Sequence, residues 1–139
     1  MLRIKEVITD EDVLAKRLKQ KIEDHTATVG VIGLGYVGLP LAVEKGKVGF
    51  KVVGFDINPA RVAKVNAGEN YIGDVKDEEL RELTQKGVLT ATTDYTQLSD
   101  CDVIVIFVPT PLTITRDPDI SYIRSSSEQI AKYLKPGQL

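Results

Sequence analysis

The sequence has little of what metal sites and disulfide frameworks need, with one cysteine, one histidine and no tryptophan in 139 residues. Because Cys101 is the only cysteine, an intrachain disulfide and a metal site with two thiolate ligands are both excluded. With His25 as the only histidine, we expect no bound metal. The charge is nearly balanced as well, with 18 Lys and Arg residues against 20 Asp and Glu residues. Since proteins that bind duplexes carry a basic excess, we expect no nucleic-acid partner.

Long apolar stretches are also missing, since no run reaches the about 18 residues that a membrane helix requires. The first 25 residues carry both signs of charge and no continuous apolar core, unlike a secretory signal. We therefore expect a cytoplasmic protein without a membrane partner. With 42% hydrophobic residues, the chain is long enough for one domain with a core and too short for two.

The N-terminal part predicts an amphipathic helix over residues 10–24 with Thr9 as its N-cap, because apolar side chains recur every four residues at Leu14, Leu18 and Ile22. Its charged face alternates Lys and Glu, which is typical of a solvated surface. We interpret residues 1–26 as a helical extension and residues 27–139 as the main domain.

From Thr28 onward, short apolar runs alternate with helical patterns. Strands are predicted at residues 28–32, 51–55, 88–92 and 103–108, and helices at residues 36–48, 59–67, 77–86 and 121–134. The nearly continuous apolar strands indicate a parallel sheet covered on both faces. This order predicts an α/β fold, a Rossmann-type doubly wound sheet with strand order 3-2-1-4 that is incomplete at its C-terminal end. The strand at residues 103–108 would then lie at an edge.

A glycine motif follows the first predicted strand directly, with Gly33, Gly35 and Gly38 spaced as Gly-x-Gly-x-x-Gly. The pattern alone is weak, but a strand before it and a helix after it are the context of a dinucleotide-binding turn. The first glycine permits the tight bend, the second admits the pyrophosphate, and the third brings the helix close to the strand. Free N–H groups at the helix start then face the phosphates. The alternative is a tight turn without a ligand.

An acidic residue ends the second predicted strand, where a carboxylate can accept hydrogen bonds from the adenosine ribose. Asp56 lies 23 residues after Gly33, and its charge would repel a 2′-phosphate, so it favours NAD over NADP. An Asx turn before Asn58 is the alternative for Asp56. Arg61 could lie over the adenine or reach the ribose, or it could be an ordinary surface arginine.

The fourth predicted strand ends in Pro109, Thr110 and Pro111, at the edge where open α/β sheets bind ligands. Two prolines restrict the backbone around Thr110 and could hold its hydroxyl in place, although a rigid turn is the alternative. Cys101 lies between Asp100 and Asp102, whose charges would raise the pKa of its thiol, so we interpret it as structural.

Three blocks of the sequence together resemble the UDP-glucose/GDP-mannose dehydrogenase family of nucleotide-sugar 6-dehydrogenases. The resemblance spans residues 27–139. The blocks are residues 31–42 around the glycine motif, residues 54–58 around Asp56, and residues 108–112 with their continuation at 118–122. Other Rossmann proteins share the glycines but not all three blocks.

The resemblance implies an enzyme that oxidises the C6 alcohol of a nucleotide sugar to a carboxylate in two NAD-dependent steps, through a thiol-bound intermediate on a cysteine. It implies cofactor contacts at matching positions: Tyr36 and Val37 at the pyrophosphate, Asp56 and Arg61 at the adenosine, Pro109 and Thr110 near the reacting centre, and Thr92 as a weaker match. The family's catalytic cysteine, lysine and aspartate would lie beyond Leu139, and Cys101 does not match the nucleophile. We therefore expect no catalytic residue in this chain, with Thr110 at most in a supporting role.

Residues 70–75 read Asn-Tyr-Ile-Gly-Asp-Val, where UDP-glucose enzymes of the family often carry Glu-Pro-Gly-Leu. Together with the N-terminal helix, this favours the branch that acts on UDP-N-acetylglucosamine or UDP-N-acetylmannosamine over UDP-glucose. We expect the truncated NAD-binding domain of such an enzyme, whose partners would be a UDP-sugar in the full-length protein and further copies of itself in a homo-oligomer. A stand-alone NAD-binding regulatory module and the cofactor domain of a β-hydroxyacid dehydrogenase are the alternatives.

Overall fold

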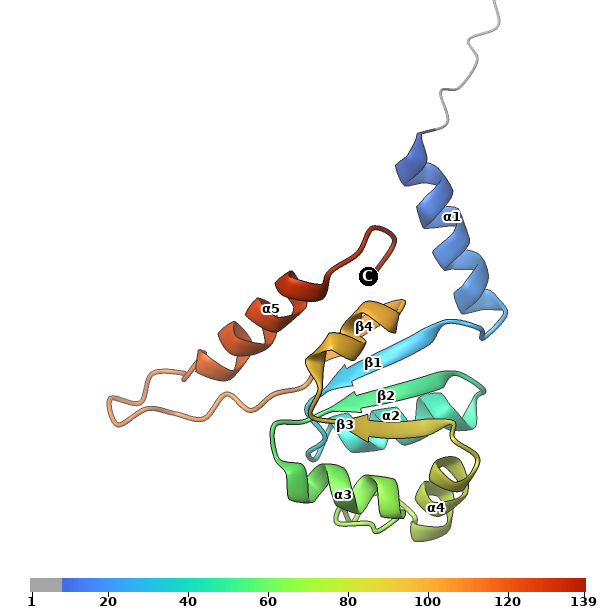
Figure 1. Ribbon diagram of the computed structural model, residues 1–139. Helices are drawn as coiled ribbons and strands as arrows, with labels where there is room; N and C mark the ends of the chain where they lie inside the picture. The colour runs from blue at the N-terminus through green and yellow to red at the C-terminus, as the bar shows by residue number, and fades with distance from the viewer. Residues whose placement is uncertain (1–8) are drawn as a thin grey trace, which may run out of the picture.

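The computed structural model describes residues 9–139 and shows four strands that alternate with helices (Figure 1). The strands are β1 (Thr28–Ile32), β2 (Lys51–Phe55), β3 (Leu89–Thr92) and β4 (Val103–Ile106). The helices are α1 (Asp10–Glu23), α2 (Gly38–Lys47), α3 (Pro59–Ala67), α4 (Asp77–Gln85), the 3₁₀ helix η1 (Tyr95–Asp100) and α5 (Ser121–Tyr133).

The four strands form one parallel sheet in the order β3-β2-β1-β4, which confirms the predicted topology. At the end of β1, Ile32 lies opposite Phe55 of β2 and Ile106 of β4, and Phe55 lies opposite Thr92 of β3. Because all four strands run in the same direction, their carboxyl ends meet at one edge. The segments that follow β1, β2 and β4 therefore lie close together there, as expected for a ligand site in an open α/β sheet.

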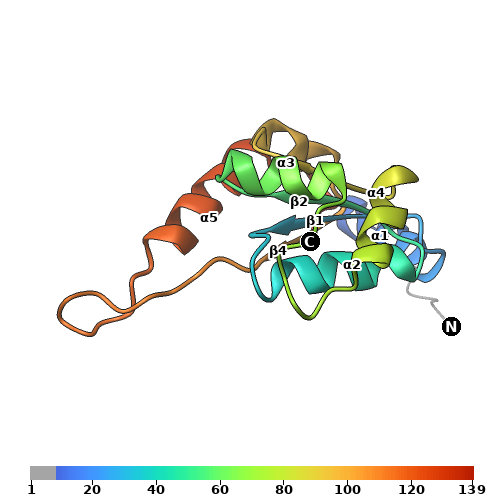
Figure 2. The ribbon, with the colours of Figure 1, turned by 90° about the horizontal axis from the view of Figure 1, so that it is seen from below.

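Each face of the sheet has its own apolar cluster. Val29 and Val31 of β1 face the cluster that contains Leu39 of α2, Val65 of α3 and Leu80 of α4. The alternate side chains face the other cluster, which holds Ile32, Phe55, Leu98 and Cys101 with Ile130 of α5 packed against it. Figure 2 shows α2 on one side of the sheet and η1 and α5 on the other. The nearly continuous apolar sequence of the inner strands follows from this double burial.

Local signals in the sequence place the start and end of α3. Asn58 accepts hydrogen bonds from the N–H groups of Ala60 and Arg61, and Pro59 occupies the first helical position. Gly68 ends the helix in the left-handed conformation at φ 72°. These three residues act as the N-cap, the first-turn proline and the C-terminal glycine that the sequence predicts.

The main departures from the sequence prediction lie around β4. The strand ends at Ile106 rather than at residue 108, because its partner strand β1 ends at Ile32, which lies opposite Ile106. The 3₁₀ helix η1 was not predicted; its start is held by Asp94, whose carboxylate accepts a hydrogen bond from the Thr96 N–H. After β4, residues 109–120 form a loop that extends far beyond the helices (Figures 1 and 2).

The outer edge of β4 carries only the beginning of a further pairing within residues 9–139. The Leu139 N–H donates to the Asp102 carbonyl at 3.0 Å, and the Ile104 N–H donates to the Leu139 carbonyl at 2.7 Å. No named strand lies beyond β4 in the described part of the chain. Its side chains are only half buried, unlike those of β1. This edge is therefore able to accept another strand.

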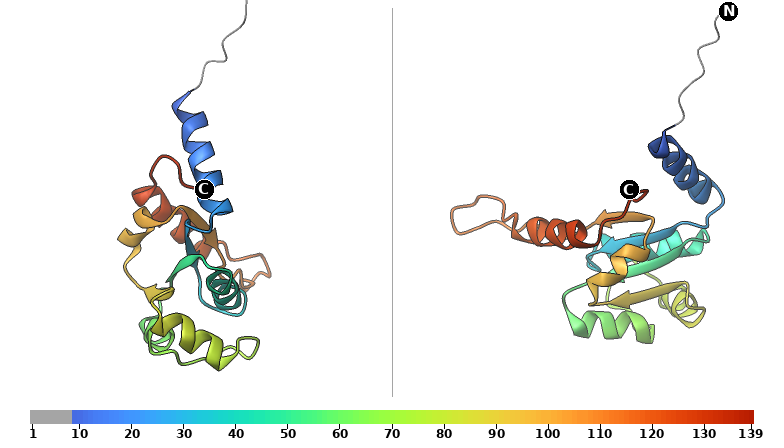
Figure 3. Two further views of the ribbon diagram at one scale, coloured as in Figure 1. Left: turned by 90° about the vertical axis from the view of Figure 1, so that its right-hand side faces the viewer. Right: turned by 45° about the horizontal axis from the view of Figure 1, so that its top comes forward.

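Helix α1 projects away from the sheet (Figure 3) and contacts the main domain along one side. Its Lys21 pairs with Asp102 at 2.9 Å, and its Leu14 lies close to Gly137. None of its side chains is fully buried. Thr9 caps it as predicted, whereas the proposed division at residue 26 stays a prediction. Among residues 9–139, no helix is both long and apolar enough to cross a bilayer.

We predict that Gly38→Ala lowers the free energy of unfolding by about 2 kcal/mol or more, because overlap with main-chain atoms cannot be relieved by moving a side chain. A Cβ atom at Gly38 would lie 1.6 Å from the carbonyl oxygen of Gly33. Gly73→Ala is the matched control, since a Cβ atom there would meet nothing within 4 Å. Chemical denaturation of both variants measures the difference, and equal stabilities would contradict the close approach.

We also predict that the 139-residue chain self-associates through the outer edge of β4, where unpaired backbone groups and half-buried apolar side chains lie together. Pairing of two chains along β4 is the homo-oligomer that can be tested from this structure. Analytical ultracentrifugation at increasing protein concentration should show dimers or larger species. A sharp monomer peak over the whole concentration range would count against it.

Candidate functional site

A cavity of about 610 Å³ opens at the carboxyl edge of the sheet. Its volume lies in the range usual for small-molecule and cofactor sites. The turn after β1 forms one wall, and the segment from Phe55 to Arg61 after β2 forms the next. The end of β4, at Phe107 to Pro109, and one face of α5 complete it. The site is thus built where the chain leaves three neighbouring parallel strands.

The glycine turn between β1 and α2 depends on two close approaches. Gly33 has φ 97°, and a Cβ atom there would lie 2.1 Å from the carbonyl oxygen of Phe107. Gly38 packs against Gly33, so that α2 begins directly behind the strand. Gly35 differs from both, because a Cβ atom on it would meet only the Arg61 guanidinium at 4.0 Å. Its missing side chain therefore leaves cavity space open, as the approach of a pyrophosphate requires.

Three successive backbone N–H groups at this turn have no acceptor among residues 9–139. They belong to Gly35, Tyr36 and Val37, which all line the cavity. Tyr36 itself is 82% exposed. Unpaired N–H groups at the start of a helix carry partial positive charge and attract anions such as phosphates. The turn thus has the donors and the space that a dinucleotide pyrophosphate needs.

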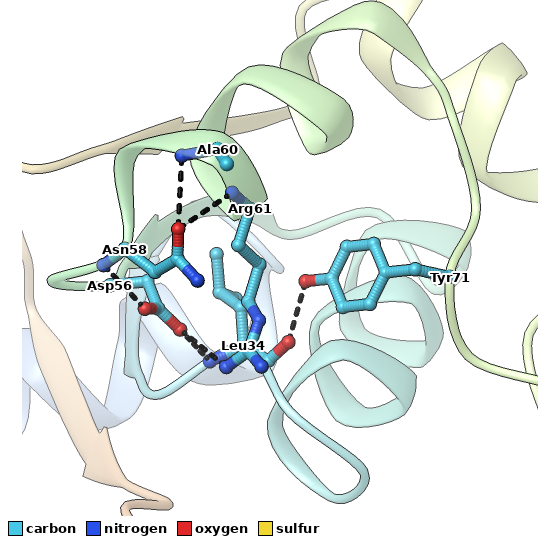
Figure 4. Close-up of polar contacts among 6 residues, drawn as sticks. All are labelled: Leu34, Asp56, Asn58, Ala60, Arg61 and Tyr71. Atoms are coloured by element: carbon cyan, nitrogen blue, oxygen red, sulfur yellow. Dashed lines mark hydrogen bonds and ion pairs between the residues drawn. The ribbon is translucent and has the colours of Figure 1, made fainter.

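Asp56 joins the glycine turn to the start of α3. One carboxylate oxygen accepts hydrogen bonds from the Leu34 N–H at 3.0 Å and from Arg61 at 3.2 Å, and the other accepts one from the Asn58 N–H at 2.9 Å (Figure 4). Asp56 is 6% exposed, so these bonds compensate for the burial of its charge. A carboxylate offers about four acceptor positions, which leaves one for a ribose hydroxyl. If Arg61 moved away from Asp56, a second acceptor position would become free for the ribose.

Arg61 projects from the first turn of α3 and lines the cavity. Its side chain is 39% exposed, and the Tyr71 ring lies beneath its guanidinium at 5.6 Å. The Tyr71 hydroxyl donates in turn to the carbonyl of Leu34 (Figure 4). Burial raises the pKa of the Tyr71 hydroxyl, which keeps it protonated. The tyrosine lies in the segment between α3 and α4 and does not itself line the cavity.

The structure brings most of the predicted site residues together around this cavity. Gly33, Gly35, Tyr36, Val37, Asp56, Arg61 and Pro109 all line it. Gly38 lies behind the turn, Thr92 ends β3 with its hydroxyl accepting a hydrogen bond from the Asp94 N–H, and Thr110 is exposed on the outgoing loop. These three do not line the cavity in this structure. The cofactor contacts assigned to all ten residues stay predictions.

The sequence analysis did not predict one wall of the cavity. Tyr95 of η1 and four residues of α5 also line it, namely Tyr122, Ser125, Ser126 and Gln129. The α5 residues are spaced by three and four positions, so they share one helical face. That polar helical face was the sequence signal that could have indicated a lining role for α5. Nothing in the sequence shows, however, that α5 folds back over the end of β4. Ser126 is one of two buried polar residues in the described chain.

Cys101 lies away from the cavity in the core beneath η1. It is 2% exposed, and burial raises the pKa of its thiol to about 12, with the charges of Asp100 and Asp102 adding to the shift. The sequence interpretation named the two carboxylates as the cause, whereas burial is the larger effect. The structural assignment of this cysteine agrees with its packing. Residues 9–139 contain no group of three potential metal ligands.

Comparisons with known proteins show which family this sequence matches. Residues 27–139 match the NAD binding domain of the UDP-glucose/GDP-mannose dehydrogenase family. The chain is 43% identical over 111 residues to the UDP-N-acetyl-D-glucosamine 6-dehydrogenase of Pseudomonas aeruginosa, which covers 80% of this chain and 25% of that protein. The chain spans about a quarter of the length of the curated relatives it matches.

Solved structures agree with this assignment. The NDP-N-acetyl-D-galactosaminuronic acid dehydrogenase of Methanosarcina mazei matches 96% of this chain and 29% of its own, with a TM-score of 0.81 and 28% identity. The UDP-D-ManNAc dehydrogenase of Pyrococcus horikoshii matches 81% of this chain and 27% of its own, with a TM-score of 0.74 and 35% identity. From the family match, the strand order and the glycine turn, we conclude that this chain belongs to the UDP-glucose/GDP-mannose dehydrogenase family and contains its NAD-binding domain.

Proposed function

We propose that this chain holds NAD for a nucleotide-sugar 6-dehydrogenase that oxidises the C6 alcohol of a UDP-N-acetylhexosamine to a carboxylate with two NAD. The observation that carries the proposal is the glycine turn, whose three free N–H groups lie beside Asp56 in one cavity. When bound, NAD supplies the hydride acceptor. The chain's own residues bind and orient it, the turn at the pyrophosphate and Asp56 at the adenosine ribose.

The sugar class rests on the relatives and on the segment before α4. The relatives named above act, by their names, on N-acetylated nucleotide sugars. Residues 70–75 lack the Glu-Pro-Gly-Leu pattern often found in UDP-glucose enzymes. Both observations favour a UDP-N-acetylhexosamine over UDP-glucose as the substrate of the parent enzyme.

We infer that residues 9–139 do not supply the catalytic thiolate of the reaction. A thiol-bound intermediate needs a reactive thiolate, and the raised pKa of Cys101 keeps its thiol protonated. The cysteine also lies outside the cavity. The chain's role is therefore to position the cofactor, while the remaining part of the parent enzyme supplies the chemistry. A stand-alone NAD-binding module is the second candidate, since the site would bind NAD equally well in either setting. The family match disfavours a β-hydroxyacid dehydrogenase.

We predict that the chain binds NAD more tightly than NADP, because the Asp56 charge repels a 2′-phosphate. Asp56→Asn should weaken NAD binding by about 10- to 100-fold, the range expected when hydrogen bonds to a charged acceptor are lost. Isothermal titration calorimetry measures both affinities. The variant should also lose its preference for NAD over NADP.

Asp10→Asn is the matched control for this experiment, because Asp10 is exposed on α1, outside the residues that line the cavity. It removes the same charge and should leave both affinities unchanged. Equal binding of NAD and NADP by the unaltered chain would disprove the role of Asp56.

We further predict that the chain alone, given NAD and UDP-N-acetylglucosamine, forms no NADH detectable by absorbance. A thiol reagent at pH 8 should label Cys101 only after denaturant is added, because the folded thiol is buried and protonated. Measurable turnover would show that the described residues contain a complete catalytic site.

A further inference from the structure

Tyr71 lies outside the cavity but contacts two groups that shape it. It belongs to the segment between α3 and α4, which connects two helices on the same face of the sheet. Its hydroxyl reaches the glycine turn and its ring reaches Arg61. Neither the glycine motif nor the strand-end acid signals such a residue.

The backbone around Tyr71 is held firmly. The Asn70 side chain accepts a hydrogen bond from the Ile72 N–H at 2.9 Å and donates to the carbonyl of Val75. The side chains of Ile72 and Val75 are buried in the apolar cluster shared with α2. Tyr71 therefore projects from an anchored segment, and its position is set by the core.

The hydroxyl of Tyr71 fixes one peptide group of the glycine turn. Leu34 is held on both sides, because its N–H donates to Asp56 and its carbonyl accepts from Tyr71. The carbonyl of Leu34 and the N–H of Gly35 belong to the same planar trans peptide, so they point in opposite directions. With the carbonyl turned toward Tyr71, the Gly35 N–H points away from it. That N–H is one of the three free donors that line the cavity.

The ring of Tyr71 packs against the guanidinium of Arg61. The guanidinium lies between the ring, 5.6 Å from its centroid, and Asp56, 3.2 Å from the carboxylate oxygen. A cation over an aromatic face is attracted to it, more strongly where the contact is partly shielded from water. The ring thus limits where the arginine can lie when a ribose competes for Asp56. The hydroxyl acts on the pyrophosphate side of the site and the ring on the adenosine side.

We propose that Tyr71 is a positioning residue for the dinucleotide, orienting the Gly35 N–H toward the pyrophosphate through its hydroxyl and holding Arg61 at the adenosine end through its ring. This inference rests on the proposed NAD binding and adds a residue that does not line the cavity. Because the Leu34 carbonyl can only accept, the hydroxyl must donate, and the burial that raises the pKa of Tyr71 keeps the proton available.

Tyr71→Phe tests the hydroxyl separately, because it keeps the ring beneath Arg61. Affinity for NAD should fall about fivefold, which corresponds to the loss of one hydrogen bond. Affinity for adenosine, which has no phosphate, should stay unchanged. Tyr71→Leu also removes the ring and should weaken binding of both ligands. NMR titration of the 139-residue chain with each ligand measures these affinities.

Tyr133→Phe is the matched control, since its hydroxyl has no hydrogen-bond partner in the described part of the chain and its residue does not line the cavity. It should bind NAD and adenosine like the unaltered chain. A purely structural tyrosine would give a Tyr71→Phe variant that loses affinity for both ligands equally, and this result would overturn the inference. If the unaltered chain binds NAD and Tyr71→Phe binds it equally well, only the inference fails. If the unaltered chain does not bind NAD, the proposed function fails with it.

Discussion

The site depends on the carboxylate of Asp56, which connects the ends of two parallel strands. It holds the Leu34 N–H at the end of β1 and the Asn58 N–H at the start of α3, and it pairs with Arg61. A buried charge needs such compensation, so the glycine turn and the N-terminus of α3 are held at a fixed distance from each other. The same carboxylate is the acceptor proposed for the ribose. In this proposal, structural and binding roles coincide in one group, and the hydrogen bonds of Asp56 hold the site in shape before a cofactor binds.

The fold could be predicted from the sequence because its signals are local. Val-rich runs indicated buried parallel strands, and Asn58 with Pro59 marked the start of α3. The strand order followed from the family of folds that the glycine turn and the acid at the next strand end indicate. Errors were confined to element ends and to η1. The Asp94 cap starts η1, and the end of the partner strand β1 sets the end of β4.

The candidate site could be predicted where its residues follow strands directly or, like Arg61, lie in the first turn of the next helix. The glycine turn, Asp56 and Pro109 lie in the segments that follow β1, β2 and β4, so parallel topology alone brings them together. Ser126 and Gln129 reach the cavity because α5 folds back across the sheet, and Tyr71 reaches the turn because a core-anchored segment passes beside it. Those contacts depend on tertiary packing between distant segments. No residue pattern in the single sequence encodes them.

The most direct test of the account is a crystal structure of this chain with NAD. We predict pyrophosphate oxygens within hydrogen-bond distance of the N–H groups of Gly35, Tyr36 and Val37, and the adenosine ribose on Asp56. A dinucleotide bound elsewhere, or one in this cavity with its phosphates turned away from the glycine turn, would contradict the account.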